Sequence, residues 1–233
     1  MRIRLDISFE NYLKMPYRYL ERLRTFVLSL LGDEYANEMY SYEKYKPLVY
    51  SQIIGKSLPY SAGLLFVPNV HIYIASILDK YIERIEKNVK YSWSQILMDK
   101  NVEIYNYEIF DRPIANNNFF STLSPICANT QITMPNGKLR ELYLSPNDTT
   151  WEAVISANLQ KKVKFFTGKD ISDNFRIKLM DRNAKSSLLF YKGVGIKGYR
   201  GRFKFEGNNE ILNYALDTGL GIHNAIGFGF INQ

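Results

Sequence analysis

The feature that most constrains the fold of this chain is the order in which its strand-like and helix-like patterns follow one another. Residues 2–9 alternate apolar and polar side chains, which is typical of a half-buried strand. A helix is predicted over residues 17–31, because leucine and valine recur there at helical spacing after Pro16. The first half is completed by strands over 47–54 and 63–75, a helix over 77–87 and a strand over 102–110. This β-α-β-β-α-β order is that of the ferredoxin-like fold.

The same order begins again after residues 112–118, a proline-marked and asparagine-rich segment that reads as a linker. The second half is predicted to contain a strand over 120–133, a helix over 151–163, a strand over 175–180, a hairpin over 188–206, a helix over 211–216 and a last strand over 226–231. We therefore predict an α+β protein of two tandem ferredoxin-like domains, residues 1–114 and 115–233.

Composition narrows the class of protein and of partner. The 233 residues carry a formal charge of +7, which favours an anionic partner such as nucleic acid, although a basic protein without such a partner fits equally well. The single cysteine, Cys127, excludes an internal disulfide framework and fits a reducing cytoplasm. One cysteine and two histidines argue against a zinc site, so we expect no metal and no other cofactor. No apolar run is long enough to cross a membrane.

Near the C-terminus, two Gly-apolar-Gly units are separated by five residues. We call residues 219–229, which contain Gly219, Gly221, Gly227 and Gly229, the glycine loop. Such glycines can let a phosphate approach the backbone, or they can serve only to end a helix and thin a packed strand. His223, one of the two histidines, lies between the two units.

Basic residues gather in the predicted hairpin over residues 188–206, namely Lys192, Lys197, Arg200, Arg202 and Lys204. Because side chains alternate along a strand, Arg200, Arg202 and Lys204 are expected on one face, about 6.7 Å apart. Such a row could follow an RNA backbone or could be an ordinary solvated face. Arg18 and Arg22, one turn apart on the first predicted helix, are further candidates for phosphate contacts.

The spacing of the glycine loop resembles the glycine-rich signature of the repeat-associated RNA-binding superfamily of CRISPR proteins. Three other segments are similar to one family of that superfamily: residues 46–51 (KPLVYS), residues 120–126 (FSTLSPI) and the helix running through residues 207–229 into the loop. On these motifs the chain is identified as a member of the CRISPR-associated repeat-RNA endoribonucleases, the sixth numbered Cas family.

The resemblance implies a tandem ferredoxin-like protein that binds the repeat of a CRISPR precursor RNA and cuts it once per repeat without a metal. In that reaction the ribose 2′-OH attacks the scissile phosphate, which leaves a 2′,3′-cyclic phosphate and a 5′-OH. The glycine loop and the basic hairpin would be the RNA ligands. The resemblance also implies an interference complex as a further partner, and it leaves monomer and homodimer open.

The chain departs from the family at the catalytic position. Most relatives carry a histidine eleven residues before the serine of the KPLVYS-like strand, where this chain has Tyr40. The lysine of that motif is retained as Lys46, with Lys44 nearby, whereas the tyrosine that some relatives carry in the first helix is replaced by Thr25. Three hypotheses follow: Tyr40 acts as a weak acid or base with Lys46 and Lys44, His223 reaches the phosphate from the glycine loop, or the protein binds repeat RNA and cuts it slowly or not at all.

Overall fold

The N-terminal half is built on a five-stranded antiparallel sheet. The computed structural model describes residues 1–110, 118–171 and 175–233. The strands lie in the order β3-β6-β1-β8-β7, with bounds Leu48–Tyr50, Val70–Ser76, Arg2–Ser8, Lys100–Phe110 and Ser94–Leu97. Helix α1 (Leu20–Leu31) connects β1 to β3, and α3 (Asp79–Tyr91) connects β6 to β8. This connection and strand order is that of the ferredoxin-like fold.

The C-terminal half repeats the plan with a four-stranded antiparallel sheet. Its strands lie in the order β12-β15-β9-β16, with bounds Arg176–Leu179, Arg202–Glu206, Phe119–Thr122 and Ile231–Asn232. Helix α4 (Trp151–Thr167) connects β9 to β12, and α5 (Asn209–Thr218) connects β15 to β16. The predicted tandem ferredoxin-like architecture is therefore confirmed. The predicted linker over 112–118 and the boundary between 114 and 115 lie outside the described residues, apart from Asn118.

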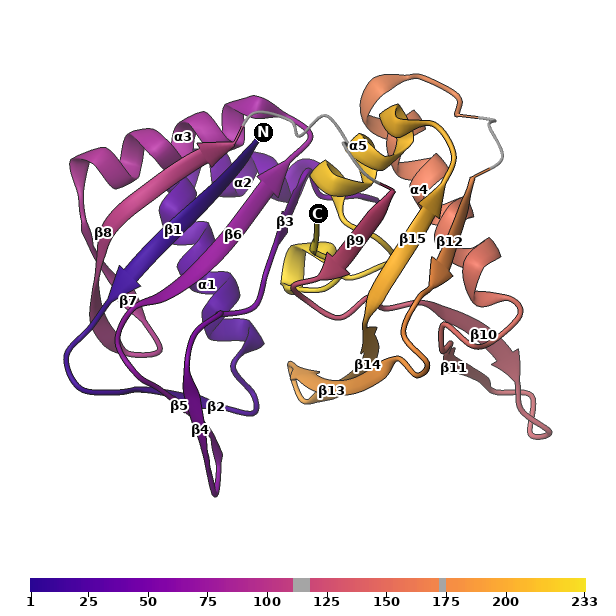
Figure 1. Cartoon of the computed structure of the whole chain (residues 1–233), viewed down its shortest axis with the longest axis horizontal. Helices are drawn as coiled ribbons and strands as arrows, with labels where there is room; N and C mark the ends of the chain where they lie inside the picture. The colour runs from indigo at the N-terminus through magenta and orange to yellow at the C-terminus, as the bar shows by residue number, and fades with distance from the viewer. Residues whose placement is uncertain (111–117, 172–174) are drawn as a thin grey trace.

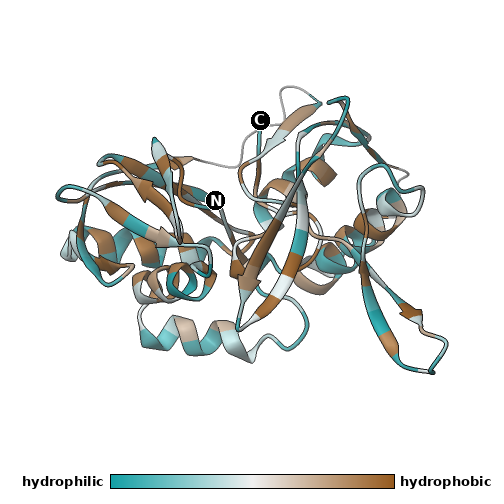
Figure 2. Cartoon of the chain, turned by 90° about the horizontal axis from the view of Figure 1, so that it is seen from below, coloured by the Kyte–Doolittle hydropathy of each residue, from teal (hydrophilic) through white to brown (hydrophobic). Residues whose placement is uncertain are grey.

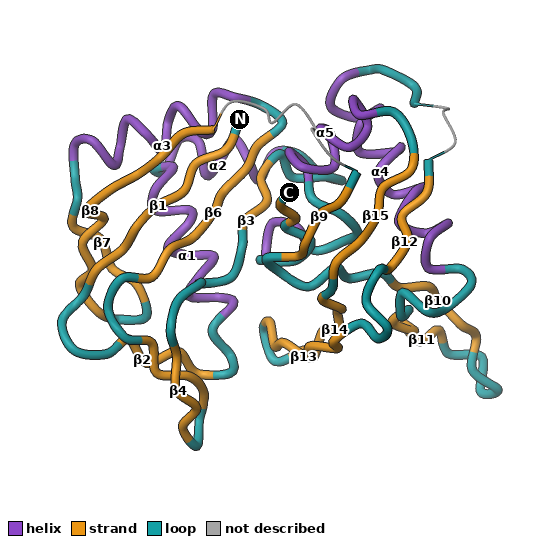
Figure 3. The backbone as a smooth tube through the Cα atoms, in the orientation of Figure 1, coloured by secondary structure: helices purple, strands orange, loops and turns teal. Residues whose placement is uncertain are grey.

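In both halves the helices of that half cover one face of its sheet, and the opposite face of the first sheet is open except where the C-terminal half packs on it (Figures 1 and 3). The alternation along β1 explains this arrangement, because Ile3, Leu5 and Ile7 are fully buried whereas Arg4 and Asp6 lie on the open face. The hydrophobic segments run through the strands and helices of both halves (Figure 2).

Three small hairpin-like additions leave the two sheets. Strands β2, β5 and β4 form a separate sheet in the N-terminal half, with bounds Leu13–Pro16, Gly63–Phe66 and Ser57–Tyr60. In the C-terminal half, β10 (Asn129–Thr133) pairs with β11 (Leu139–Tyr143), and β13 (Lys185–Tyr191) pairs with β14 (Val194–Arg200). The β10–β11 hairpin projects away from the rest of the half (Figure 1).

Several predicted boundaries are wrong, each for a local reason. Helix α1 begins at Leu20 rather than residue 17, because the Tyr17 N–H donates to the Ala62 carbonyl in a turn of the small sheet. The predicted strand over 63–75 is two strands, separated by a turn in which Asn69 takes a φ of 69°. Residues 35–46 show no strong period in the sequence, yet most of helix α2 (Asp33–Ser41) lies there.

In the C-terminal half, the predicted strand over 120–133 is interrupted after β9, and the last strand is shortened to β16 by the short helix η1 (Asn224–Ile226). The predicted hairpin over 188–206 also divides, because the chain leaves β14 at Gly201 and enters β15, which belongs to the other sheet.

The two halves share buried surface. Phe228 and Cys127 belong to the same apolar cluster as the first sheet, and Phe230 packs with Val49 and Ala75 of strands β3 and β6. Arg2 is buried between the halves, where its guanidinium donates to the carbonyl oxygens of Leu216 and Ile231 and to Oδ1 of Asn232. The glycine loop itself lies against β3 of the N-terminal half, where the Tyr50 hydroxyl donates to the Ala225 carbonyl oxygen at 3.1 Å (Figure 1).

Candidate functional site

A cavity of about 260 Å³ lies where three segments meet: the chain after α2, the middle of α4 and the glycine loop. We call it the glycine-loop pocket. Its lining includes Lys44, Lys46 and His223, three of the four predicted catalytic residues, which come from opposite halves of the protein. No Asp or Glu is among the described residues that line it. The pocket is therefore a cationic site suited to an anionic group.

Lys46 is held at the C-terminal end of α2. Its ammonium donates to the carbonyl oxygen of Tyr40 at 3.1 Å and also to that of Tyr42. Partial burial lowers the pKa of Lys46 below its ordinary value, and the nearby Arg24 lowers it further, against an opposing effect of Glu43. The residue is thus a cation held in the pocket lining by two carbonyl oxygens.

Tyr40, the fourth predicted catalytic residue, lies beside the pocket rather than in its lining, and its side chain is 46% exposed. Two cations lie over its ring: the Arg24 guanidinium carbon is 5.0 Å and the Lys46 Nζ is 6.0 Å from the ring centroid. The Nε of Arg24 is buried without a hydrogen-bond partner among the residues that the structure describes. Sequence reasoning missed Arg24 because α2, the element that carries Tyr40 toward it, was not predicted.

Lys44 and His223 complete the predicted catalytic set. The Lys44 Nζ lies 5.7 Å from the ring centroid of Tyr45, which also lines the pocket. His223 takes a left-handed conformation with φ of 65° and packs edge-on against Phe228. Desolvation lowers the pKa of His223 below its ordinary value of 6.5, and Glu141 acts in the opposite direction. A neutral imidazole therefore lines the pocket together with Lys44 and Lys46 near pH 7.

The glycine loop is shaped by contacts within the protein. A Cβ at Gly221 would lie 2.1 Å from the carbonyl oxygen of Cys127, and one at Gly229 would lie 2.0 Å from that of Leu220. Both glycines also have positive φ, of 71° and 74°. The loop needs glycine at these positions because backbone passes so close to them, that of Cys127 at Gly221 and the loop's own Leu220 at Gly229. The expectation that Gly219 ends a helix is confirmed, since it is the C-cap of α5.

Lys162 of α4 is a site residue that sequence reasoning missed. Its Nζ donates to the carbonyl oxygens of Gly219 at 2.6 Å and Gly221 at 3.0 Å, and to Oδ1 of Asn224 at 2.8 Å. The signal was present, because position 162 falls on the buried face of α4 with Ile155, Leu159 and Val163.

The predicted row of three cations on the basic hairpin forms only in part: Arg202 and Lys204 share the face of β15 opposite the buried Phe203 and Phe205, but Arg200 does not continue the row. Arg200 ends β14 and turns inward, donating to the Leu123 carbonyl and to Oε1 of Gln52. Arg202 and Lys204 lie on β15, where they pair with Asp181 at 3.0 Å and Glu206 at 3.1 Å. The row is incomplete because the strand breaks at Gly201, between the two sheets.

The remaining predicted RNA ligands are scattered. Arg18 precedes α1, so the expected helical face shared with Arg22 does not form; its guanidinium lies 5.7 Å from the ring centroid of Phe190. Arg22 forms an ion pair with Asp99. Lys192 and Lys197 extend over the tyrosine rings of Tyr191 and Tyr199 on the β13–β14 hairpin.

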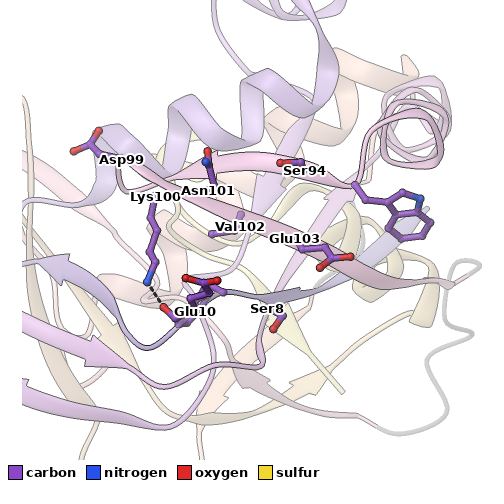
Figure 4. Close-up of a pocket in the computed structure, with 10 residues that line it drawn as sticks. Ser8, Glu10, Ser94, Asp99, Lys100, Asn101, Val102 and Glu103 are labelled. Atoms are coloured by element: carbon purple, nitrogen blue, oxygen red, sulfur yellow. Dashed lines mark hydrogen bonds between the residues drawn. The ribbon is translucent and has the colours of Figure 1, made fainter.

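A larger groove, about 760 Å³, lies at the far end of the first sheet, and its chemistry is different. Figure 4 shows Glu10, Asp99 and Glu103 around it, with the Lys100 ammonium bound to the carbonyl oxygen of Glu10. Its one cation is thus already used, and its carboxylates would repel a nucleic acid backbone. Size alone does not make it the functional site.

Neither a metal centre nor a membrane span is found in the part of the chain that the structure describes. Its histidine, cysteine and acidic residues form no group of three or more able to hold a metal ion. None of its helices is long and apolar enough to span a bilayer.

Comparison with known proteins finds one family by sequence and by fold. The sequence model of the family described as "CRISPR associated protein Cas6, C-terminal" matches residues 106–233. The CRISPR-associated endoribonuclease Cas6 1 of Methanocaldococcus jannaschii is 24% identical over 242 residues, covering 99% of this chain and 92% of that protein. A putative CRISPR-associated endoribonuclease-like protein Cas6 of Pyrococcus furiosus is 26% identical over 169 residues, covering 70% and 67% of the two chains.

Two solved structures share the fold at low sequence identity. A Cas6-related gene product from Pyrococcus furiosus superposes with a TM-score of 0.87 at 23% identity, covering 100% of this chain and 97% of that one. An RAMP protein described as binding different RNA substrates superposes with a TM-score of 0.85 at 23% identity, covering 100% and 98%. Both matches cover the whole chain, so these two structures share the fold of both halves and not only that of the C-terminal half.

Proposed function

This chain belongs to the CRISPR-associated Cas6 family, and on that premise we propose that it binds CRISPR repeat RNA and cleaves the precursor once per repeat at the glycine-loop pocket. The observation that carries the proposal is the convergence of Lys44, Lys46 and His223, from two halves of the chain, on one cavity without carboxylates. A phosphodiester is the anionic group that such a site in an RNA-binding family would receive.

The proposed reaction needs no metal-bound water, because the 2′-OH of the substrate is the nucleophile. The 2′-oxygen attacks the adjacent phosphorus while the bond from phosphorus to the 5′-oxygen breaks, which gives a 2′,3′-cyclic phosphate and a 5′-OH. A base must take the proton of the 2′-OH, an acid must protonate the leaving 5′-oxygen, and a cation must stabilise the charge of the phosphorane.

The residues around the pocket can divide these roles. His223 is neutral near pH 7, because desolvation lowers its pKa, and it can therefore accept the proton of the 2′-OH. Lys46 and Lys44 supply positive charge for the phosphorane. Tyr40, held beneath Arg24 and next to Lys46, has a phenolic O–H that can protonate the leaving oxygen.

A second function is favoured by a specific observation. The Lys46 ammonium is already engaged by the carbonyls of Tyr40 and Tyr42, and Tyr40 stands where most relatives carry histidine. A site arranged in this way can hold a phosphate while providing little acid–base catalysis. The alternative is therefore a repeat-RNA-binding protein whose cleavage is slow or lost.

A single-turnover assay separates the two functions. End-labelled repeat RNA is incubated with excess protein in EDTA, and the new 3′ end is tested for a cyclic phosphate that phosphatase removes only after acid opening. We expect one cut per repeat. The matched control is the same RNA with a 2′-deoxy nucleotide at the mapped cut, which should bind equally and remain intact. Binding of both RNAs without cleavage would support the alternative, and no preference over transfer RNA at physiological salt would contradict both functions.

A further inference from the structure

Lys162 is buried beneath the glycine loop, and the proposed chemistry leaves it without a role. The residue is 2% exposed, yet no Asp or Glu of the described residues forms an ion pair with it. Taking a cation out of water without a carboxylate is costly, and an apolar side chain of similar length, such as methionine, would fill the same space without that cost. A lysine at this position therefore needs a reason beyond packing.

The geometry around Lys162 matches its charged form. Three oxygen acceptors surround Nζ at 2.6, 3.0 and 2.8 Å: the carbonyls of Gly219 and Gly221, and Oδ1 of Asn224. An ammonium has three protons, one for each acceptor. A neutral amine has only two, and it would turn its lone pair toward the third oxygen. Loss of the proton therefore breaks one of the three contacts that hold the loop.

Asn224 extends this contact to the second glycine unit. Its Oδ1 accepts from Lys162, and its Nδ2 donates to the carbonyl oxygens of Leu220 and Phe228, both at 3.1 Å. Leu220 and Phe228 are the central residues of the two Gly-apolar-Gly units. A single ammonium thus braces the whole loop from inside.

The surroundings of Lys162 make its charge sensitive to an anion. Burial alone lowers the pKa of Lys162 to about 7. Four other titratable residues line the pocket with Lys162: Lys44, Tyr45, Lys46 and His223. Two more lie close by, since Glu141 acts on His223 and the carbonyl of the buried Cys127 packs against Gly221. A phosphate that enters the pocket would bring a negative charge toward the ammonium, and an opposite charge nearby favours the charged form.

We propose that Lys162 is a positioning residue whose ammonium sets the glycine loop in its phosphate-binding form, and that it takes up a proton when an RNA phosphate enters the pocket. The inference rests on the proposed function. Lys162 does not touch the reacting atoms, because its three protons are all given to the loop. Its contribution is to hold the loop and to add one uncompensated charge beneath it.

The loop-positioning part is tested on the free protein. The amide resonances of Gly219, Gly221 and Asn224 are followed by NMR from pH 6 to 9 in the full chain. We expect a common titration with a midpoint near 7 that is absent in Lys162→Met and unchanged in Lys161→Met, which alters an exposed lysine on the same helix. Resonances that do not titrate in the wild type, or that titrate equally in Lys162→Met, would overturn the proposal.

The coupling part is tested with repeat RNA at pH 6.5 and 8.5. We expect Lys162→Met to bind about tenfold more weakly than the wild type at pH 6.5 and about equally at 8.5, since linkage ties the affinity to one proton. A purely structural role would give the same ratio at both pH values, and that result would overturn the coupling.

A measurement on the wild type alone covers the case in which Lys162→Met does not fold. Calorimetric titration at pH 8 in Tris and in HEPES buffers reports the number of protons bound with the RNA. Uptake of about half a proton or more supports the proposal, and no uptake overturns it. Absence of repeat-RNA binding by the wild type, with the loop amides still titrating, would instead contradict the proposed function and leave the loop-positioning result standing.

Discussion

The glycine-loop pocket and strand β15 both carry cations that the sequence analysis assigns to the RNA site, Lys44 and Lys46 as catalytic residues and Arg202 and Lys204 as RNA ligands, but these cations differ in their partners. In the pocket, Lys44, Lys46 and Lys162 lie together without a described carboxylate in the lining. On β15, Arg202 and Lys204 are paired with Asp181 and Glu206. Counting charge along a sequence does not separate these cases. The difference between the regions is that the fold pairs the cations of β15 with carboxylates and leaves those of the pocket lining without one.

The largest expected effect lies in the pocket and is on the rate of cleavage. Lys46→Ala should reduce the single-turnover rate about 100- to 1,000-fold, the usual cost of removing one group that stabilises the charge of the transition state. Lys204→Ala on β15 should change the rate less than about threefold, because an exposed, paired lysine contributes little. Both variants are measured with labelled repeat RNA at saturating protein. Equal losses in the two variants would remove the distinction between the regions.

The next effect concerns stability and compares two glycines. Gly221→Ala and Gly193→Ala both place a side chain at positive φ, of 71° and 78°. At Gly193, in the turn of the β13–β14 hairpin, a Cβ meets nothing within 4 Å, so only the backbone strain of about 1 kcal/mol is expected. At Gly221 it would meet the Cys127 carbonyl at 2.1 Å, which should raise the loss to about 3 kcal/mol or more.

Urea unfolding of the two glycine variants measures the difference directly, since the strain common to both cancels. Similar free energies of unfolding would show that the loop yields around Gly221, and the close packing of the glycine loop would then not be the reason for its glycines.

The elements that were predicted well carry a regular pattern of apolar side chains in their own sequence, and the missed element does not. The strand over 2–9 and the apolar faces of α1 and α3 follow from side chains that alternate or recur at helical spacing, and the core buries those side chains. Helix α2 was missed because Met39 is its only buried residue, so it shows no apolar stripe. The site depends on α2, and Arg24 over Tyr40 was lost with it.

Arg200 shows a second limit of prediction from sequence. Alternation along a strand holds only while the strand continues, and the chain changes sheet at Gly201. Its guanidinium then meets Gln52, a residue 148 positions away that no local pattern connects to it. Lys162 was visible in the pattern, as a lysine on an apolar helix face, but its three acceptors appear only when the glycine loop folds over it.

The pH dependence of the cleavage rate should follow the titration of His223 and Lys46 in the glycine-loop pocket, and not that of residues on β15. Desolvation lowers the pKa of His223 below 6.5, so the neutral base forms as pH rises and the rate should increase through a midpoint below 6.5. The pKa of Lys46 is lowered below its ordinary value of 10.5, so the rate should fall again as that cation is lost, before pH 10.5. The profile is measured under single turnover. His223→Ala should abolish the acidic limb, and an unchanged limb would remove His223 from the reaction.

The smallest expected effect is that of Asp181→Asn, which removes the carboxylate that pairs with Arg202 on β15 and leaves the arginine itself unchanged. Hydrogen bonds from the backbone N–H and the side chain of Arg202 lower the pKa of Asp181, which is therefore ionised at neutral pH and compensates that arginine. Asp181→Asn frees the cation.

If RNA follows this strand, affinity for repeat RNA should rise about two- to threefold and the slope of log affinity against log salt should steepen by up to about one. Fluorescence anisotropy across a KCl series measures both quantities, with Asp170→Asn, which frees the exposed Lys164 on α4, as the matched control. An equal change in the two variants would show only a general increase in charge, whereas a change confined to Asp181→Asn would mean that β15 binds RNA and that its ion pairs restrain it.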